Sequence, residues 1–164
     1  MIKFILGITI IAFATFCGYL LTRKYRQRKE FFLQFKEFNE RFLTEISYTR
    51  RPISEFVALY SYKGEFEMLL QIFFDTISKK NLKEEKLTDN ALFCFLTQEE
   101  KSLTEDYFLM IGKGDSISQK GYFSSAKEKL IKLQNDSESA CKRYGDLYIK
   151  IGFLCGLFIL ILII

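Results

Sequence analysis

The chain has 164 residues, of which 49% are hydrophobic, with a formal net charge of +4 at pH 7. This hydrophobic content is typical of a folded chain and excludes a disordered one. The chain has no histidine, which excludes Ser-His-Asp and Cys-His catalytic sites and most zinc sites. No two cysteines have C-x-x-C spacing, so neither a zinc site nor a disulfide framework is supported. We expect no metal, no cofactor and no enzymatic activity.

The N-terminal stretch, residues 2–21, is apolar except for Lys3 and is long enough to cross a hydrocarbon core of about 30 Å. A cleaved signal peptide is the alternative, since Ala12 and Ala14 form an A-x-A-like pair. The apolar run continues beyond this pair, however, and its basic residues follow it instead of preceding it. We therefore predict an uncleaved transmembrane helix over residues 1–22.

Apolar side chains then recur at helical spacing from Phe31 to Ile46. This pattern predicts that the first membrane helix continues as an amphipathic stem and ends near Tyr48. Pro52 suits the first turn of a second helix, which we expect Gly64 to end.

An apolar stripe that begins at Phe66 predicts a further helix to about Ser78. Residues 79–86 are polar and are expected to form a connection. A helix is then predicted from Thr88, with an inward face made of Leu92, Phe95 and Leu96.

The pair Ser102 and Glu105 has capping-box spacing and predicts the start of another helix, which we expect Gly112 to end. Its inward face would consist of Leu103, Tyr107, Met110 and Ile111. Neighbouring acidic residues, such as Glu99 with Glu100 and Glu105 with Asp106, point about 100° apart on a helix. We interpret them as solvated faces and not as a cation site.

The last 49 residues, from a second capping-box pair at Ser116 and Gln119, read as one uninterrupted helix. Its seam positions alternate steps of three and four, as in a coiled coil, at Phe123, Ala126, Leu130, Leu133, Ser137, Ala140, Tyr144, Leu147 and Ile151. Residues 148–164 are predicted to cross a membrane. Within this span, Gly152 and Gly156 form a small-x-x-x-small motif that favours close helix packing, within the chain or between subunits.

Basic residues flank the inner edges of both predicted spans, at Arg23, Lys24, Arg26, Arg28, Lys29, Lys142, Arg143 and Lys150. By the positive-inside rule, both termini lie outside with only short tails, and residues 23–147 form a cytosolic domain. The juxtamembrane position explains the basic cluster, so we expect no nucleic-acid partner. No stretch alternates with period two, and the predicted fold is all-α: a helical cytosolic bundle between an N-terminal and a C-terminal transmembrane helix, whose stems continue the membrane helices.

Two sequence blocks carry a resemblance to a known family. The first consists of Glu45, Ile46, Tyr48, Pro52, Ile53 and Glu55, and it follows an E-I-x-Y-x-x-x-P-L-x-E pattern. The second, Gly112, Asp115 and Gln119, follows G-x-x-D-x-x-x-Q. With the two apolar ends, these blocks show that the chain resembles the stage III sporulation protein AB family along nearly its whole length. Arg51 departs from the family pattern, which often has Thr before the proline.

The resemblance implies a membrane platform or scaffold in the channel-like secretion complex between mother cell and forespore, in the cell membrane on the mother-cell side. Members of this family are similar to the inner-membrane platform subunit of type II secretion systems. The implied partners are a cytosolic sporulation ATPase, other stage III sporulation membrane proteins and other copies of the chain. The expected partner interface consists of Glu45, Tyr48, Pro52, Glu55, Gly112, Asp115 and Gln119.

Two other functional classes are open to this sequence. A two-span membrane signalling adaptor would transmit motion along the stems, although the short expected outer tails argue against it. A secreted helical protein, formed after signal cleavage, is disfavoured by the apolar carboxyl end.

Overall fold

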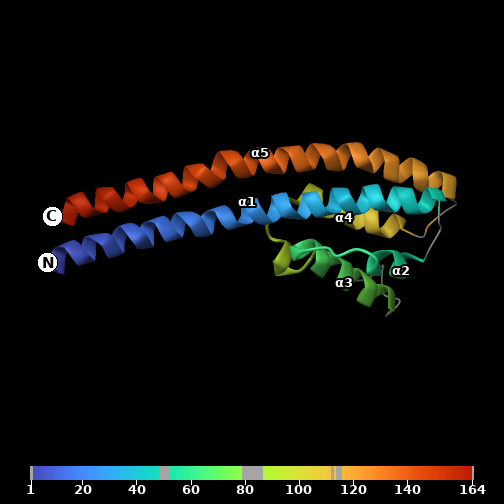
Figure 1. Ribbon diagram of the computed structural model, residues 1–164, viewed down its shortest axis with the longest axis horizontal. Coiled ribbons are helices and arrows are strands. Elements are labelled where there is room, and N and C mark those ends of the chain that lie inside the picture. The colour runs from blue at the N-terminus through green and yellow to red at the C-terminus, as the bar shows by residue number, and fades with distance from the viewer. Residues whose placement is uncertain (1, 49–51, 79–86, 112, 114–115, 164) are drawn as a thin grey trace. The chain divides into compact units, whose positions relative to one another are not determined.

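The computed structural model describes residues 2–48, 52–78, 87–111, 113 and 116–163. Its elements, in chain order, are α1 (Ile2–Tyr48), α2 (Ile53–Ala58), α3 (Gly64–Ser78), a 3-10 turn η1 (Ala91–Phe93), α4 (Gln98–Met110) and α5 (Ser116–Ile163) (Figure 1). The described residues contain no strand, which confirms the predicted all-α class. Two compact units are present: unit 1 is Met1–Lys29 with Asp136–Ile164, and unit 2 is Glu30–Asn135.

The longest predicted helices are confirmed. The first runs without a break to Tyr48, the apolar stripe from Phe66 lies in α3, and the final helix is continuous to Ile163. Gly64 has a different role from the one expected, because α2 already ends at Ala58. Gly64 begins α3 with a φ of 63°, a left-handed conformation that favours glycine.

The helix predicted from Thr88 is wrong. Only the 3-10 turn η1 forms there, because the Asn90 side chain accepts a hydrogen bond from the Leu92 amide at 3.2 Å and closes a local turn. Leu92, expected to face inward, is exposed, whereas Phe95 and Leu96 are buried. The polar connection predicted over residues 79–86 lies outside the described residues.

The predicted capping box was placed one turn too late. Thr97 caps α4 at the amide of Glu100, and the Glu100 carboxylate accepts from the Thr97 amide at 2.9 Å. Glu105 instead accepts a hydrogen bond of 2.6 Å from the Thr88 hydroxyl. The threonine pair and the serine pair have the same spacing in the sequence, so spacing alone does not choose between them.

The core of unit 2 is built around the phenylalanines of α1. Phe35 lies 4.8 Å from Tyr107 of α4 between ring centroids, and Phe38 lies 5.6 Å from Phe66 of α3. Phe42 contacts the rings of α2 and α5. The α1 side of this unit therefore contacts every other helix of the unit, through buried rings at Phe31, Phe32, Phe35, Phe38 and Phe42.

One polar group lies in the middle of this aromatic core. Asn39 is fully buried, its side-chain nitrogen donates to the Phe123 carbonyl oxygen at 3.2 Å, and its oxygen accepts from the Tyr107 hydroxyl at 2.8 Å. Burial raises the pKa of Tyr107 well above its ordinary value. Because a buried amide is costly unless it is hydrogen-bonded, Asn39 fixes how α1, α4 and α5 of unit 2 align.

Candidate partner interface and helix seam

Three helix ends meet at one corner of unit 2, where α1 ends, α2 follows and α5 begins. The Phe42 ring lies 5.6 Å from Phe56 of α2 and 5.0 Å from Phe123 of α5. Tyr48 lies six residues after Phe42, and Ile117 lies six residues before Phe123. Since α1 and α5 are antiparallel here, Tyr48 and Ile117 occupy the same end of the unit. We call the surface made by Tyr48, Pro52, Glu55, Ile117 and Gln119 the α1–α2–α5 corner.

Three of the six residues in the first sequence block, Tyr48, Pro52 and Glu55, are open to solvent at this corner. Tyr48 is 85% exposed, and Pro52 and Glu55 are exposed as well. Pro52 precedes α2 with an extended backbone, and Glu55 lies in the first turn, where a negative charge favours the helix dipole. Glu45 differs, because only 9% of it is exposed. Of the two glutamates expected to contact a partner, Glu55 is therefore the one placed to present its charge.

The second sequence block is only partly described. Gly112 and Asp115 lie outside the described residues. Gln119, in the first turns of α5, donates from its side-chain nitrogen to the Lys113 carbonyl oxygen at 3.0 Å, so it ties the start of the helix to the preceding segment. Ile117 was missed by the sequence analysis, although it is 83% exposed. The sequence could have indicated this exposure, because Ile117 lies outside the apolar seam of the helix, and an apolar residue outside the seam does not face the core.

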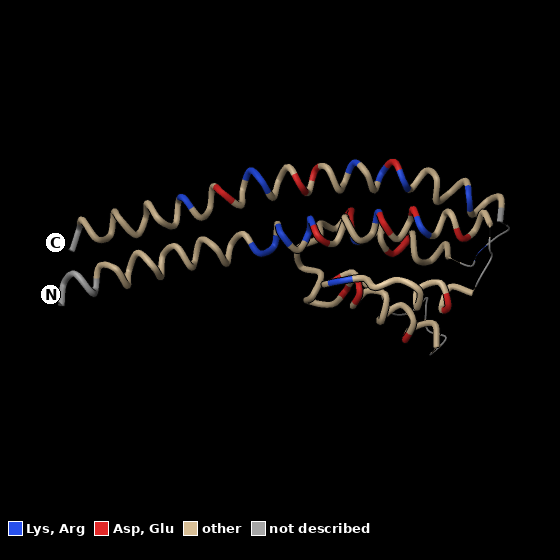
Figure 2. The backbone as a smooth tube through the Cα atoms, in the orientation of Figure 1, with Lys and Arg blue, Asp and Glu red and all other residues tan. Residues whose placement is uncertain are grey.

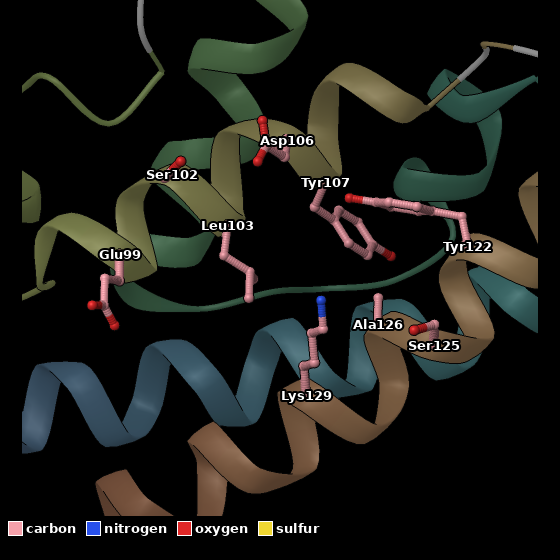
Figure 3. Close-up of a pocket in the computed structure, with 9 residues that line it drawn as sticks. All are labelled: Glu99, Ser102, Leu103, Asp106, Tyr107, Tyr122, Ser125, Ala126 and Lys129. Atoms are coloured by element: carbon pink, nitrogen blue, oxygen red, sulfur yellow. The ribbon is translucent and has the colours of Figure 1, made fainter.

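A pocket of about 370 Å³ lies between α4 and α5 of unit 2 (Figure 3). Its floor is apolar, with Leu103, the Tyr107 ring and Ala126. Glu99 and Asp106 lie on the α4 side, and the Lys129 side chain extends from α5 toward α4. The lining residues are Glu99, Ser102, Leu103, Asp106, Tyr107, Tyr122, Ser125, Ala126 and Lys129.

The pocket separates acidic residues that the sequence analysis interpreted together as solvated faces. Glu100 is buried in the cap of α4 and Glu105 accepts from Thr88, whereas Glu99 and Asp106 line the pocket. Burial, followed by the nearby Asp106 carboxylate, raises the pKa of Tyr122. The pocket thus combines an apolar floor with charged rims, a composition suited to a side chain of a partner.

The second candidate feature is a seam of small residues in unit 1, where α1 and α5 pack against each other. A Cβ atom added at Gly152 would lie 2.7 Å from the Ala14 carbonyl oxygen, and one at Gly156 would lie 2.9 Å from the Ile11 Cα. At Gly18, it would lie 2.5 Å from the Tyr148 carbonyl oxygen. The two backbones therefore approach so closely that only glycine fits, and Gly152 and Gly156 face α1 of the same chain.

The helix contact keeps the predicted register as far as Tyr144, which stacks on Tyr25, and departs from it at the last two positions. Leu147 and Ile151, expected on the seam, are 46% and 45% exposed. The contacts pass instead through Tyr148, Gly152 and Gly156, which are four residues apart. Glycine allows the helix backbones to touch, so the contact follows the row of small residues and not the row of large ones.

Large apolar side chains cover the outside of unit 1. Phe13 and Phe16 of α1 and Phe153 and Phe158 of α5 are between 47% and 67% exposed. Figure 2 shows the stretches of α1 and α5 that carry them without Lys, Arg, Asp or Glu. Among the described residues, one helix segment, Ile117–Ile161, is long and apolar enough to cross a membrane, and its most apolar window is 6% buried. A core helix of a water-soluble protein would be mostly buried, so this finding supports membrane association.

The family model described as stage III sporulation protein AB (spore_III_AB) matches residues 3–164. No curated protein and no solved structure matches the chain.

Proposed function

This chain belongs to the stage III sporulation protein AB family, and we propose that it is a non-catalytic platform subunit of the channel-like secretion complex between mother cell and forespore. The observation that carries this proposal is that α1 and α5 each take part in two different units. In unit 1 they form a helix pair with an apolar exterior, which is suited to lipid. In unit 2 they belong to a helical bundle with an aromatic core, which is suited to water and protein partners. The lack of histidine supports a role in assembly instead of acid–base catalysis.

We infer that both α1 and α5 cross the membrane. The glycine seam pairs residues 7–18 of α1 with residues 148–160 of α5, and the latter belong to the candidate membrane helix. A segment that packs backbone to backbone along a membrane helix shares its depth in the bilayer. The exposed phenylalanines of α1 then have lipid around them, which removes the cost of exposing them to water.

The basic flanks give the orientation in this proposal. Arg23, Lys24 and Arg26 follow the apolar part of α1, and Lys142 and Arg143 precede the apolar part of α5. The positive-inside rule places these groups at the cytosolic surface, with unit 2 in the mother-cell cytosol and both termini on the other side.

The proposed partner of unit 2 is the cytosolic sporulation ATPase, by analogy with the platform subunits of type II secretion systems. The α1–α2–α5 corner is our proposed contact surface. It combines two exposed large apolar side chains, Tyr48 and Ile117, with the exposed carboxylate of Glu55. Exposed aromatic anchors contribute most of the affinity at interfaces, and a charge at the rim guides docking.

The test is recruitment of the ATPase to membranes by the full-length protein when both are produced together. We expect the unmodified protein to bring the ATPase into the membrane fraction. The double variant Tyr48→Ser, Glu55→Lys removes an anchor and reverses a charge at the corner, and it should reduce recruitment at least about tenfold. Lack of recruitment by the unmodified protein would contradict the platform role.

Two matched variants show whether the effect belongs to this corner. Glu67→Lys with Met68→Ser makes the same kind of change on exposed residues of α3 and should leave recruitment unchanged. Glu99→Lys with Asp106→Lys reverses both carboxylates of the α4–α5 pocket. If recruitment falls for the pocket variant and persists for the corner variant, the ATPase meets α4 and α5 instead.

A further inference from the structure

Three tyrosine rings meet between α1 and α5 of unit 1, next to the charge-free stretches of both helices. The Tyr25 ring stacks on Tyr144 with centroids 5.2 Å apart and on Tyr148 at 6.0 Å. We call Tyr25, Tyr144 and Tyr148 the tyrosine cluster. Tyrosine is enriched where a membrane helix leaves the hydrocarbon, since its ring is apolar and its hydroxyl is polar. The cluster therefore has the composition of a membrane–water boundary.

Cations lie over tyrosine rings at and beside this cluster. The Lys24 ammonium lies 5.2 Å from the centroid of Tyr25, and the Arg143 guanidinium lies 5.6 Å from that of Tyr144. Arg26 lies 5.7 Å from the centroid of Tyr19 and donates a hydrogen bond of 3.0 Å to its hydroxyl. Ring contacts of this kind orient a cation while leaving its charge uncompensated.

In the described part of the chain, no acidic residue of unit 1 forms an ion pair with these three cations. Residues 1–29 contain no Asp or Glu. On α5, Glu138, Lys142 and Asp146 recur every four residues on one face, and Lys142 binds Glu138 at 3.0 Å. Arg143 lies next to that row, three residues before Asp146, but the two form no ion pair. Within the described part of the chain, no ion pair involves Lys24, Arg26 or Arg143.

We propose that Lys24, Arg26 and Arg143 bind headgroup phosphates of the anionic phospholipids that surround unit 1 at the cytosolic surface of the membrane. Each cation is held on a ring, carries an uncompensated charge, and retains N–H donors that a phosphate oxygen can accept. In this proposal the tyrosine cluster lies at the depth where the acyl chains end, so the lipid headgroups at this depth meet the cations beside the rings. This inference rests on the proposed function, because it requires that α1 and α5 cross the bilayer.

The test uses the fact that the chain contains no tryptophan, so one introduced tryptophan is the sole such reporter. Leu20→Trp places it beside Tyr19 at an exposed position of α1. The full-length protein is reconstituted in vesicles of brominated phosphatidylglycerol or brominated phosphatidylcholine, mixed with the unbrominated lipids. The brominated anionic lipid should quench this tryptophan more strongly than the brominated zwitterionic lipid does. The difference should correspond to at least about fivefold tighter binding of the anionic lipid, and this affinity ratio should decrease as salt is added.

In the variant Lys24→Gln, Arg26→Gln, Arg143→Gln, the ratio of the affinity for the anionic lipid to that for the zwitterionic lipid should fall close to one. A matched variant, Lys127→Gln, Lys129→Gln, Lys132→Gln, removes the same charge from unit 2 and should keep the preference. Equal quenching by both lipids in the Leu20→Trp protein would overturn the proposal. So would a preference that survives removal of the three unit 1 cations.

A second reporter separates this proposal from the two-span proposal. Phe13→Trp lies in the charge-free stretch of α1, and brominated phosphatidylcholine should quench it strongly. Suppose that Phe13→Trp is strongly quenched but that both brominated lipids quench Leu20→Trp equally. This result would support the membrane span and overturn only the proposal of anionic lipid binding. An unquenched Phe13→Trp would overturn both.

Discussion

Phenylalanine occupies opposite places in the two units of this protein. In unit 2, rings such as Phe35 and Phe38 are fully buried, and an amide, Asn39, is buried with them. In unit 1, Phe13 and Phe158 are 67% and 65% exposed, while Gly18 and Gly152 lie at the helix contact. The same two helices, α1 and α5, thus present large residues inward in one unit and outward in the other.

The difference follows from the solvent that each unit is built for. In water, burying an aromatic side chain is favourable by about 2 to 3 kcal/mol, and unit 2 has an aromatic core. In lipid, a phenylalanine gains little by moving from the acyl chains into a protein interior. Helix association then depends on close backbone contact, which glycine permits.

Matched phenylalanine truncations should separate the two units most clearly. Phe35→Ala removes a ring that contacts Phe66 and Tyr107, and it should lower the free energy of unfolding of the full-length protein by about 3 to 5 kcal/mol. Phe13→Ala removes an exposed ring and should change it by less than about 0.5 kcal/mol. Denaturant titration in detergent, followed by circular dichroism, measures both. Equal losses would contradict the inside-out arrangement of unit 1.

Two glycines of α5 make a matched pair for the seam. Gly152→Ala places a methyl group 2.7 Å from the Ala14 carbonyl oxygen and should force the helices of unit 1 apart, at a cost of about 1 to 3 kcal/mol. Gly145 has no atom within 4 Å of an added Cβ, so Gly145→Ala should stabilise the helix by up to about 1 kcal/mol.

The separation can be measured with spin labels at positions 8 and 159, in protein from which the native cysteines have been removed. The distance between labels should increase for Gly152→Ala and stay constant for Gly145→Ala. An unchanged distance for both variants would mean that the seam does not hold the two helices together.

Asn39 and Tyr107, whose side chains are hydrogen-bonded in the core of unit 2, should be energetically coupled. Asn39→Ala leaves the Tyr107 hydroxyl without its acceptor in the core, which should cost about 1 to 3 kcal/mol. Tyr107→Phe removes the other partner. In a double-mutant cycle, the combined variant should lose less than the sum of the single losses. Strict additivity would show that this hydrogen bond does not couple α1 to α4.

The smallest expected effect appears at alkaline pH. Burial raises the pKa of Tyr107 well above its ordinary value near 10. Below pH 10, the phenol is protonated in both the folded and the unfolded state. Above it, the unfolded chain releases the proton first, so stability should fall by about 1.4 kcal/mol per pH unit until the folded pKa is reached.

Tyr107→Phe should remove this contribution and flatten the pH profile. Part of the decline should persist, because the pKa values of Tyr62 and Tyr122 are raised by burial as well. Unfolding free energies of both proteins between pH 9 and pH 11 make the comparison. Parallel profiles would contradict a buried, protonated Tyr107.

Sequence periodicity predicted the parts of the fold that depend on long runs of residues. The stem from Phe31, the stripe of α3 and the uninterrupted α5 all follow from apolar spacing over several turns. It failed where a single side chain decides between a turn and a helix. Asn90 closes a turn by bonding to a nearby amide, and Thr97 caps α4 in place of Ser102.

The candidate surfaces depend on contacts that have no sequence signature. Glu45 and Glu55 have the same chemistry, yet packing buries only the first. The α4–α5 pocket needs residues from two helices, and neither helix shows it alone. The small-residue motif at Gly152 and Gly156 was visible in the sequence, which left its partner open between the first span and another subunit, and the structure pairs it with Ala14, Gly18 and Ile11 of α1.

In the proposed arrangement, unit 1 lies in the bilayer and unit 2 in the cytosol. Thiol labelling with a membrane-impermeant reagent tests it most directly, on full-length protein without native cysteines that carries either Phe13→Cys or Ser102→Cys. We predict that Ser102→Cys reacts only after lysis, and that Phe13→Cys reacts only when detergent replaces the lipid. Labelling of Ser102→Cys in intact cells, or of Phe13→Cys in lysed membranes, would contradict this arrangement.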